Sequence, residues 1–169
     1  NVRAWGLAAD GTQTFSSDAD RGMGKIARGD YPSVLAELIG DNAAPGTPVI
    51  ICGMAGARQG WLEAPYLDTP ADLTRLVQGA VAPEGTGFAV RILPGVCQRT
   101  AGHEDVMRGE ETQLLGLLAL RPGFSGTAIL PGTHSKWVEI DNGRIVRFST
   151  AMTGELYEVV NRYSFLSEG

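Results

Sequence analysis

One short run of residues constrains the fold of this chain more than any other. Residues 48–52 form an unbroken apolar, largely β-branched stretch, which is typical of a strand buried on both faces of a sheet. The next predicted strand covers residues 88–93. Residues 31–39 carry an apolar stripe at helical spacing, and residues 69–70 read as an N-cap followed by proline, which predicts a helix through about residue 79. Buried strands that alternate with helices predict an α/β fold with a mixed sheet.

The remaining elements complete one predicted domain, and the final hairpin is the one place where a second domain could start. We expect a hairpin of strands 2–7 and 13–16 around Asp10-Gly11, and a second hairpin of strands 136–140 and 144–149 around Asn142-Gly143. The other predicted elements are a polar loop at 94–105, a helix at 109–120, a strand at 127–130 and a closing helix that begins near Thr153.

Charge and composition exclude several functions. The net charge is −5 and the only lysines are Lys25 and Lys136, so the chain lacks the positive field of a nucleic-acid-binding protein. An anionic ligand would have to be held locally, by backbone N–H groups, a metal ion or a few arginines. No apolar stretch approaches 18 residues, so we expect no membrane partner.

The two cysteines indicate neither a disulfide framework nor a metal site. Cys52 ends the apolar run at 48–52 and is predicted to be a small core residue. We expect both Cys52 and Cys97 to be reduced, which suits the cytoplasm. The chain starts at Asn1 and enters a strand at once, which predicts that it is a fragment of a longer protein.

Residues 130–137 are the first segment that could carry chemistry. A strand ends in a Gly-Thr turn that is followed by His134, Ser135 and Lys136. Backbone N–H groups at such a turn can hold phosphate oxygens, and hydroxyl and lysine side chains can add donors. The spacing is not that of a Walker A loop. The alternative is an ordinary β-turn that leads into a hairpin.

Residues 105–113 place several carboxylates at the start of a helix, namely Asp105, Glu110 and Glu111. The helix dipole favours negative charge at that end, so one glutamate is explained by capping alone. The functional alternative is a general base that takes a proton from a substrate hydroxyl.

Residues 53–61 leave the end of the predicted buried strand, where open α/β sheets usually bind ligands. Arg58 could pair with a carboxylate, with Gln59 beside it, and Trp61 could pack on a sugar ring. The alternative is a surface arginine and a half-buried tryptophan.

A simple cap explains Thr153 at the closing helix. His103 and His134 are far apart and no cysteines pair with them, so a zinc site is not expected; a Gly-x-Ser-x-Gly elbow is absent, which argues against a serine hydrolase.

Taken together, the segments at 53–66, 105–113, 130–138 and 152–156 resemble the 2-dehydro-3-deoxygalactonokinase family, in order and along nearly the whole chain. The resemblance implies a ribonuclease-H-like, actin-like ATPase fold, in which a mixed sheet is flanked by helices. It implies phosphorylation of 2-dehydro-3-deoxy-D-galactonate at its 6-hydroxyl by ATP with Mg²⁺, in the bacterial cytoplasm. Two departures matter: the family's first phosphate loop precedes the position of Asn1, and its C-terminal domain is missing. The chain is therefore expected to be the N-terminal part of such a kinase and inactive alone.

The resemblance also implies roles for particular residues. In related sugar kinases a carboxylate that opens a helix precedes a phosphate loop that begins with Gly-Thr, and here Glu110 lies 22 positions before Gly132. This favours Glu110 as the base, with Glu111 and Asp105 as alternatives. The ATP phosphates are assigned to Gly132, Thr133, His134, Ser135 and Lys136, and the substrate to Arg58, Gln59 and Trp61. The metal ligands are not identified.

Other functions remain open at this level. The chain could belong to a kinase for another sugar or sugar acid, and the galacto and gluco acids are not distinguished. A module that senses nucleotides or sugars without catalysis is a further alternative, although regulators usually carry a basic DNA-binding element. The expected partner is a small sugar acid, without nucleic acid, and a homodimer is left open.

Overall fold

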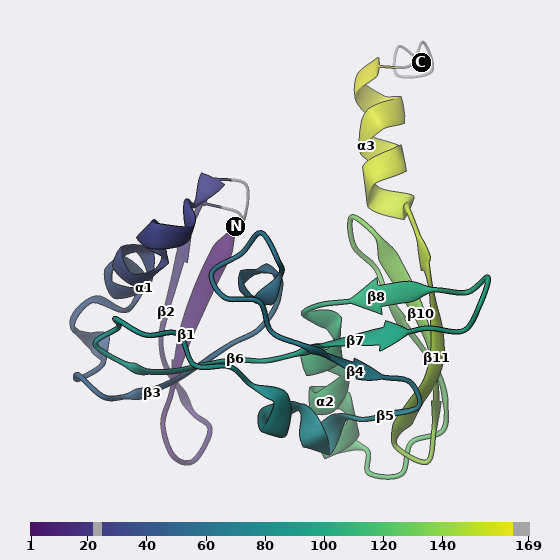
Figure 1. The fold of residues 1–169 in the computed structure, drawn as a ribbon, viewed down its shortest axis with the longest axis horizontal. Coiled ribbons are helices and arrows are strands. Elements are labelled where there is room, and N and C mark those ends of the chain that lie inside the picture. The colour runs from purple at the N-terminus through teal and green to yellow at the C-terminus, as the bar shows by residue number, and fades with distance from the viewer. Residues whose placement is uncertain (22–24, 164–169) are drawn as a thin grey trace. The chain divides into compact units, whose positions relative to one another are not determined.

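The computed structural model describes residues 1–21 and 25–163, which form mixed α/β structure in two compact units (Figure 1). The first unit contains Asn1–Pro65 and Val77–Pro94, and the second contains Tyr66–Leu76 and the residues from Gly95 onward. The mixed α/β class predicted from the sequence is confirmed. Within the described ranges, no helix has the length and apolar character needed to span a membrane.

The first unit begins with the predicted hairpin. Strands β1 (Val2–Leu7) and β2 (Gln13–Ala19) pair antiparallel, and the Asp10 carboxylate accepts the backbone N–H of Thr12 at 2.9 Å in the turn. The strands β3 (Pro48–Ile51) and β6 (Ala89–Ile92) pair in parallel. Short 3₁₀ helices connect these elements: η2 (Arg28–Asp30), η3 (Gly40–Asn42) and η4 (Met54–Gly56).

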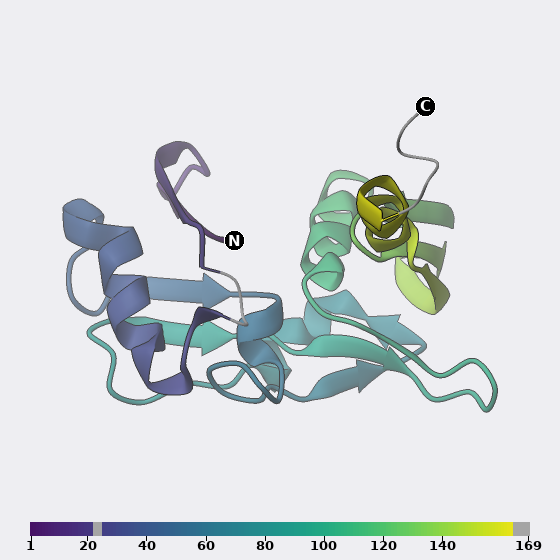
Figure 2. The ribbon, with the colours of Figure 1, turned by 90° about the horizontal axis from the view of Figure 1, so that it is seen from above.

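Helix α1 (Tyr31–Ile39) supplies one side of the core of this unit. The helix has the predicted bounds, and its apolar stripe is buried as the spacing predicted. Figure 2 shows α1 beside the parallel pair of β3 and β6. The buried core contains Ile26, Tyr31, Val34, Leu38, Trp61, Ala64, Val90 and Ile92.

The prediction that residues 48–52 are buried on both faces is wrong. Burial alternates along β3, and Ile50 is 58% exposed. Cys52, predicted as a core residue, is also exposed. The physical reason is that β3 belongs to a two-stranded sheet whose apolar partners lie on the side of Val49 and Ile51, so the opposite face of β3 is left uncovered within this unit.

The second unit contains two sheets. The first has the order β5-β11-β10-β9 and is antiparallel throughout. Its strands are β5 (Ala71–Asp72), β9 (Gly126–Leu130), β10 (Ser135–Asp141) and β11 (Arg144–Ala151). The second sheet has the order β4-β7-β8, with β4 (Tyr66–Asp68), β7 (Gly95–Gln98) and β8 (Asp105–Met107). The predicted Asn-Gly turn joins β10 to β11, and both of its residues have positive φ, 47° at Asn142 and 76° at Gly143.

Two α-helices complete the unit. The helix α2 (Glu110–Leu120) packs on the first sheet through Leu114 and its neighbours. The buried core contains Ala71, Leu73, Leu76, Val96, Met107, Leu114, Val138, Ile140, Ile145 and Phe148. The helix α3 (Thr153–Tyr163) follows β11 and projects beyond the end of that strand (Figure 1). It buries none of its residues and exposes the apolar side chains of Leu156, Val159, Val160 and Tyr163, which share one helix face.

Two predictions in the second unit are wrong. The helix predicted from Thr69-Pro70 is instead strand β5 followed by the 3₁₀ helix η5 (Leu73–Gly79). Its actual cap is Asp72, whose carboxylate accepts the backbone N–H of Thr74 at 3.0 Å, while Ala71 and Asp72 pair with β11. The loop predicted at 94–105 contains β7, in which all four residues are buried. The pairing of β7 with β4 and β8 buries even the polar Gln98, and no local sequence pattern reveals that pairing.

Candidate active site

The segments singled out in the sequence fall into both units. The carboxylate segment and the Gly-Thr loop lie in the second unit, and the Arg58 segment lies in the first.

The carboxylates open α2 in the predicted way. Gly109 immediately precedes the helix with a φ of 112°, which side-chain-bearing residues rarely adopt. It offers no side chain as a cap, and the two glutamates that follow cap the turn instead. Glu110 Oε2 accepts the backbone N–H of Arg108 at 3.1 Å, and Glu111 Oε2 accepts that of Gly109 at 2.6 Å. Both carboxylates thus satisfy backbone donors at the positive end of the helix.

Glu111 is fully buried, whereas Glu110 is half-buried. Burial raises the pKa of the Glu111 carboxyl to about 7, and the neighbouring Glu110 carboxylate adds to the rise. Hydrogen bonds from the backbone and from the Thr112 hydroxyl oppose it. The chain therefore places a carboxyl that changes charge near neutral pH next to one that is partly open to solvent.

The third carboxylate, that of Asp105, lies in a different environment. Both of its oxygens lie within hydrogen-bond distance of the Thr150 hydroxyl, at 2.8 and 2.7 Å. The ammonium of Lys136 is 3.6 Å from Oδ1. Asp105 at the start of β8 is thus already paired with a cation, which distinguishes it from the two glutamates as a candidate base.

The Gly-Thr loop connects β9 to β10 and is held from two sides. Within the loop, the N–H of Gly132 donates to Ser135 Oγ at 3.3 Å. At the start of α3, the N–H groups of Gly154 and Glu155 donate to the carbonyls of Gly132 and Thr133, at 3.2 and 3.0 Å. The loop therefore caps the helix, and its backbone is fixed by the same bonds.

Side chains add to this contact between the loop and α3. His134 Nε2 lies 2.5 Å from the Glu155 carboxylate, and the hydroxyls of Ser135 and Thr153 are hydrogen-bonded. Gly154 packs so closely that a Cβ there would lie 2.5 Å from the Gly132 carbonyl oxygen. Thr153, predicted as a simple cap, instead joins the loop to the helix. Gly132, Thr133 and His134 remain exposed.

In the first unit, the segment at 53–61 forms a tight loop after β3. The carbonyl of Ala55 accepts the N–H of Trp61 at 2.8 Å. Gly60 lies so close to the backbone that a Cβ added to it would be 2.4 Å from the Met54 carbonyl oxygen. Arg58 and Gln59 are exposed at the tip. Trp61 is only 7% exposed and stacks on Tyr31 with ring centroids 5.6 Å apart. Its ring therefore belongs to the core of the unit, while Arg58 and Gln59 face solvent.

Arg28 braces this loop, and sequence reasoning missed it. Its Nη2 donates to the Arg58 carbonyl at 2.6 Å and its Nε to the Gly60 carbonyl at 3.1 Å. No local pattern marks an arginine that acts 30 residues away. Glu155 and Thr150 were also missed as individual contacts, although a register for the 136–149 hairpin would have placed Thr150 opposite Lys136.

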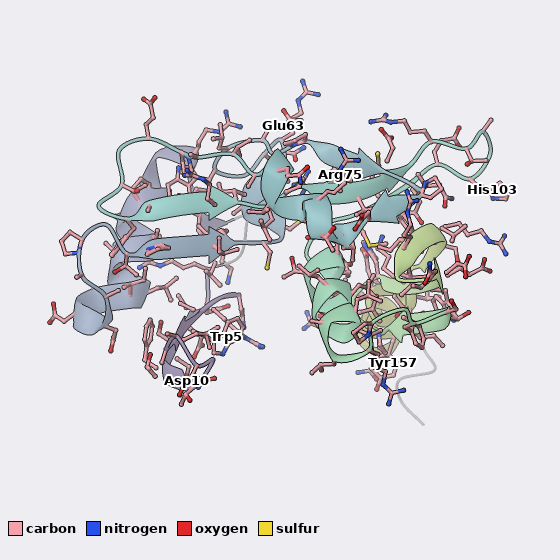
Figure 3. All side chains as sticks on the ribbon, turned by 90° about the horizontal axis from the view of Figure 1, so that it is seen from below. Trp5, Asp10, Glu63, Arg75, His103 and Tyr157 are labelled. Atoms are coloured by element: carbon pink, nitrogen blue, oxygen red, sulfur yellow. The ribbon has the colours of Figure 1, made fainter. Side chains whose placement is uncertain are left out.

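A separate hollow of about 420 Å³ lies in the second unit and contains none of the predicted site residues. Its walls come from the β7–β8 hairpin and from β9, β10 and β11, and it contains His103, which Figure 3 shows at the tip of that hairpin. The Arg147 guanidinium and the Glu139 carboxylate, joined by two hydrogen bonds of 2.6 Å, lie in its wall.

The described part of the chain contains no cluster of three or more His, Cys, Asp or Glu side chains suited to a metal ion. Mg²⁺ bound with ATP does not require such a cluster, because it keeps several waters and is held mainly by phosphates and one or two carboxylates. Glu110 and Asp105 lie in the same unit as the Gly-Thr loop, and both carboxylates retain some exposed surface.

The burial of Glu111 predicts a pH-dependent stability. Its folded-state pKa of about 7 lies above the ordinary value of 4.5. Between those values the folded protein keeps a proton that the unfolded chain loses, so the free energy of unfolding falls as pH rises from about 4.5 to 7. Glu111→Gln removes this effect. Urea unfolding at each pH gives the free energy of unfolding of both proteins. From pH 5 to pH 8, the value for the variant should rise by roughly 2–3 kcal/mol relative to that of wild type.

Glu104→Gln, at an exposed carboxylate, controls for the loss of one negative charge. If the free energies of unfolding of Glu111→Gln and wild type differ by the same amount at pH 5 and at pH 8, the prediction is contradicted.

Comparison with known proteins places these segments in a family. The family model described as 2-keto-3-deoxy-galactonokinase matches residues 1–169. A protein of Rhizobium meliloti (strain 1021) named "probable 2-dehydro-3-deoxygalactonokinase DgoK1" is 45% identical over 168 residues, which are 99% of this chain and 55% of that protein. The 2-dehydro-3-deoxygalactonokinase of Escherichia coli (strain K12) is 37% identical over 169 residues, or 100% of this chain and 56% of that protein.

A solved structure gives the same result. The crystal structure of a protein described as a 2-dehydro-3-deoxygalactonokinase from Sinorhizobium meliloti matches with a TM-score of 0.89 and 44% identity, and the match covers 98% of this chain and 55% of that one. The chain thus spans about half the length of the curated relatives that it matches. It belongs to the 2-keto-3-deoxy-galactonokinase family, as the model matched along residues 1–169 establishes.

Proposed function

We propose that this chain forms the N-terminal part of an ATP-dependent kinase that phosphorylates the 6-hydroxyl of 2-dehydro-3-deoxy-D-galactonate. The observation that carries the proposal is the pair of relatives at 45% and 37% identity that bear this enzyme's name. The carboxylate helix and the Gly-Thr loop lie in one compact unit, which supports a phosphoryl-transfer site. The proposal concerns a protein of the relatives' full length.

We further assign the fold to the ribonuclease-H-like, actin-like ATPase class. The N-terminal hairpin, the parallel pair of β3 and β6 and the alternation of strands and helices support this assignment. The apolar face of α3, made by Leu156, Val159, Val160 and Tyr163, is exposed, which supports a longer protein in which that face is covered. A cytoplasmic location and a small-molecule partner follow from the proposed reaction.

In the proposed mechanism Glu110 is the general base. Its carboxylate is half-buried at the start of α2 and is held by the Arg108 N–H at 3.1 Å. It accepts the proton of the sugar-acid hydroxyl as the oxygen attacks the γ-phosphorus of ATP and the bond to the β-phosphate oxygen breaks. Glu111 beside it is largely protonated below its pKa of about 7, so it does not compete for the proton there. Asp105 is already paired with Lys136.

The Gly-Thr loop supplies the phosphate contacts. Gly132, Thr133 and His134 are exposed, and bonds to α3 and Ser135 hold the loop backbone before ATP arrives. Lys136 was assigned to the phosphates from the sequence, but its ammonium is buried beside the Asp105 carboxylate. A preorganised loop stabilises charge on the phosphates without reorganisation during the reaction. When bound with ATP, Mg²⁺ would neutralise part of the phosphate charge.

Arg58 and Gln59 position the acid. A guanidinium binds a carboxylate through two parallel hydrogen bonds, and Arg58 is exposed on a loop that Arg28 and Gly60 keep rigid. Trp61 contributes from the core, where its stacking on Tyr31 fixes the end of the loop.

Glu110→Gln tests the base. In the full-length enzyme, kcat should fall by about 10²–10⁴-fold, because an amide cannot accept the proton. Steady-state rates of ADP release with the sugar acid provide the measurement. The matched control is Glu84→Gln, an exposed glutamate in the first unit. A loss of less than tenfold in a folded variant would exclude Glu110 as the base.

Arg58→Met tests the substrate contact. A charge-assisted hydrogen bond contributes about 1.5–3 kcal/mol, so KM for the sugar acid should rise roughly 10–100-fold with a smaller change in KM for ATP. Arg75→Met, at another exposed arginine, is the control. An unchanged KM removes Arg58 from the site, and comparing the galacto with the gluco acid in the same assay defines the preferred substrate.

A further inference from the structure

The side chain of Lys136 points into the second unit and not out of the Gly-Thr loop that it follows. The side chain is only 7% exposed. Its ammonium donates to the Val106 carbonyl at 2.6 Å and to the Thr150 hydroxyl at 2.5 Å, and it lies 3.6 Å from Asp105 Oδ1. The ring of Phe148 lies 5.8 Å from the ammonium and covers it further.

Two hydrogen bonds and one ion pair already engage the lysine. An ammonium has three N–H donors, and three protein acceptors surround this one. The Thr150 hydroxyl accepts from Lys136 and can give its own proton to Asp105, so the three side chains form one closed network. Because the Lys136 side chain is buried and already bonded, a phosphate could contact the ammonium only by taking the place of one of these protein acceptors.

The network joins the two segments proposed to carry the chemistry. Lys136 directly follows the loop at 132–135 on β10, and Thr150 is its cross-strand partner on β11. Val106 and Asp105 belong to β8, which leads through Arg108 and Gly109 into Glu110. One ammonium therefore fixes the strand that carries the base relative to the strand that carries the phosphate loop.

We propose that Lys136, together with Thr150 and Asp105, is a positioning device that fixes the carboxylate helix relative to the Gly-Thr loop, and that Lys136 is not a phosphate ligand. This inference rests on the proposed kinase function for its catalytic consequences. It also assigns Asp105 a structural role, because its carboxylate is the anionic partner of the buried ammonium.

Kinetics separate the two roles of Lys136. The variants are Lys136→Met, Thr150→Val and Asp105→Asn in the full-length enzyme. Each should lower kcat by about tenfold or more while KM for ATP changes less than about threefold, since a base displaced by an ångström loses rate and not ATP affinity. Because the three side chains act as one unit, the Thr150→Val/Asp105→Asn double variant should be no slower than the slower single variant.

The opposite pattern would overturn the inference. If Lys136→Met raises KM for ATP more than about tenfold while Thr150→Val and Asp105→Asn keep wild-type kcat, the ammonium binds phosphate. Additive losses in the double variant would likewise show that Thr150 and Asp105 do not act together.

Hydrogen exchange tests the device without any assay of activity. The Arg108 and Gly109 N–H groups are bonded to Glu110 and Glu111, so their exchange reports whether the start of α2 is held. In Thr150→Val, which keeps the side-chain volume and should fold, these amides should exchange about tenfold faster, while α1 in the other unit is unaffected. Unchanged exchange overturns the inference. A wild-type enzyme inactive toward sugar acids would refute the proposed function, and the exchange result would still decide whether the device exists.

Discussion

The start of α3 is hydrogen-bonded to the Gly-Thr loop, and the shape of the loop depends on this contact. The carbonyls of Gly132 and Thr133 accept the first N–H groups of the helix, and Gly154 leaves no space for a side chain between them. The first N–H groups of a helix lack partners within the helix, and here the loop carbonyls accept two of them. Each satisfies the other, so the loop is shaped before any ligand binds. The same segment continues into Lys136, which reaches the strand before the carboxylate helix.

Electrostatics divide three neighbouring carboxylates into three roles. Asp105 faces a buried ammonium, Glu111 is buried and has a pKa raised to about 7, and Glu110 keeps a partly open position at the helix start. Only one carboxylate is needed to accept the proton. When the other two are protonated or paired with a cation, they repel an anionic substrate less. The arrangement supports the proposal that Glu110 is the base.

Local patterns predicted the elements whose cause is local. The stripe of α1, the Asn142-Gly143 turn, the hairpin at β1 and β2 and the start of α2 follow from spacing and turn chemistry within a few residues. The failures involve long-range partners. The burial of β7 depends on pairing with β4 and β8. The helical turn begins after Asp72 and not at the predicted cap, Thr69, because Ala71 pairs with β11. Trp61 was predicted to be able to pack on a sugar ring, whereas in the structure its ring stacks on Tyr31, 30 residues earlier. The division into two units was also not visible, because the chain passes between them more than once.

We have proposed that this chain belongs to an enzyme that transfers phosphate from ATP to a sugar acid. The most direct measurement is ³¹P NMR of a reaction that contains the full-length enzyme, MgATP and 2-dehydro-3-deoxygalactonate. We expect the γ-phosphate signal to disappear as ADP and one new phosphomonoester, coupled to the protons on C6, appear in equal amounts. Inorganic phosphate as the sole new product, or ATP left intact, would contradict it.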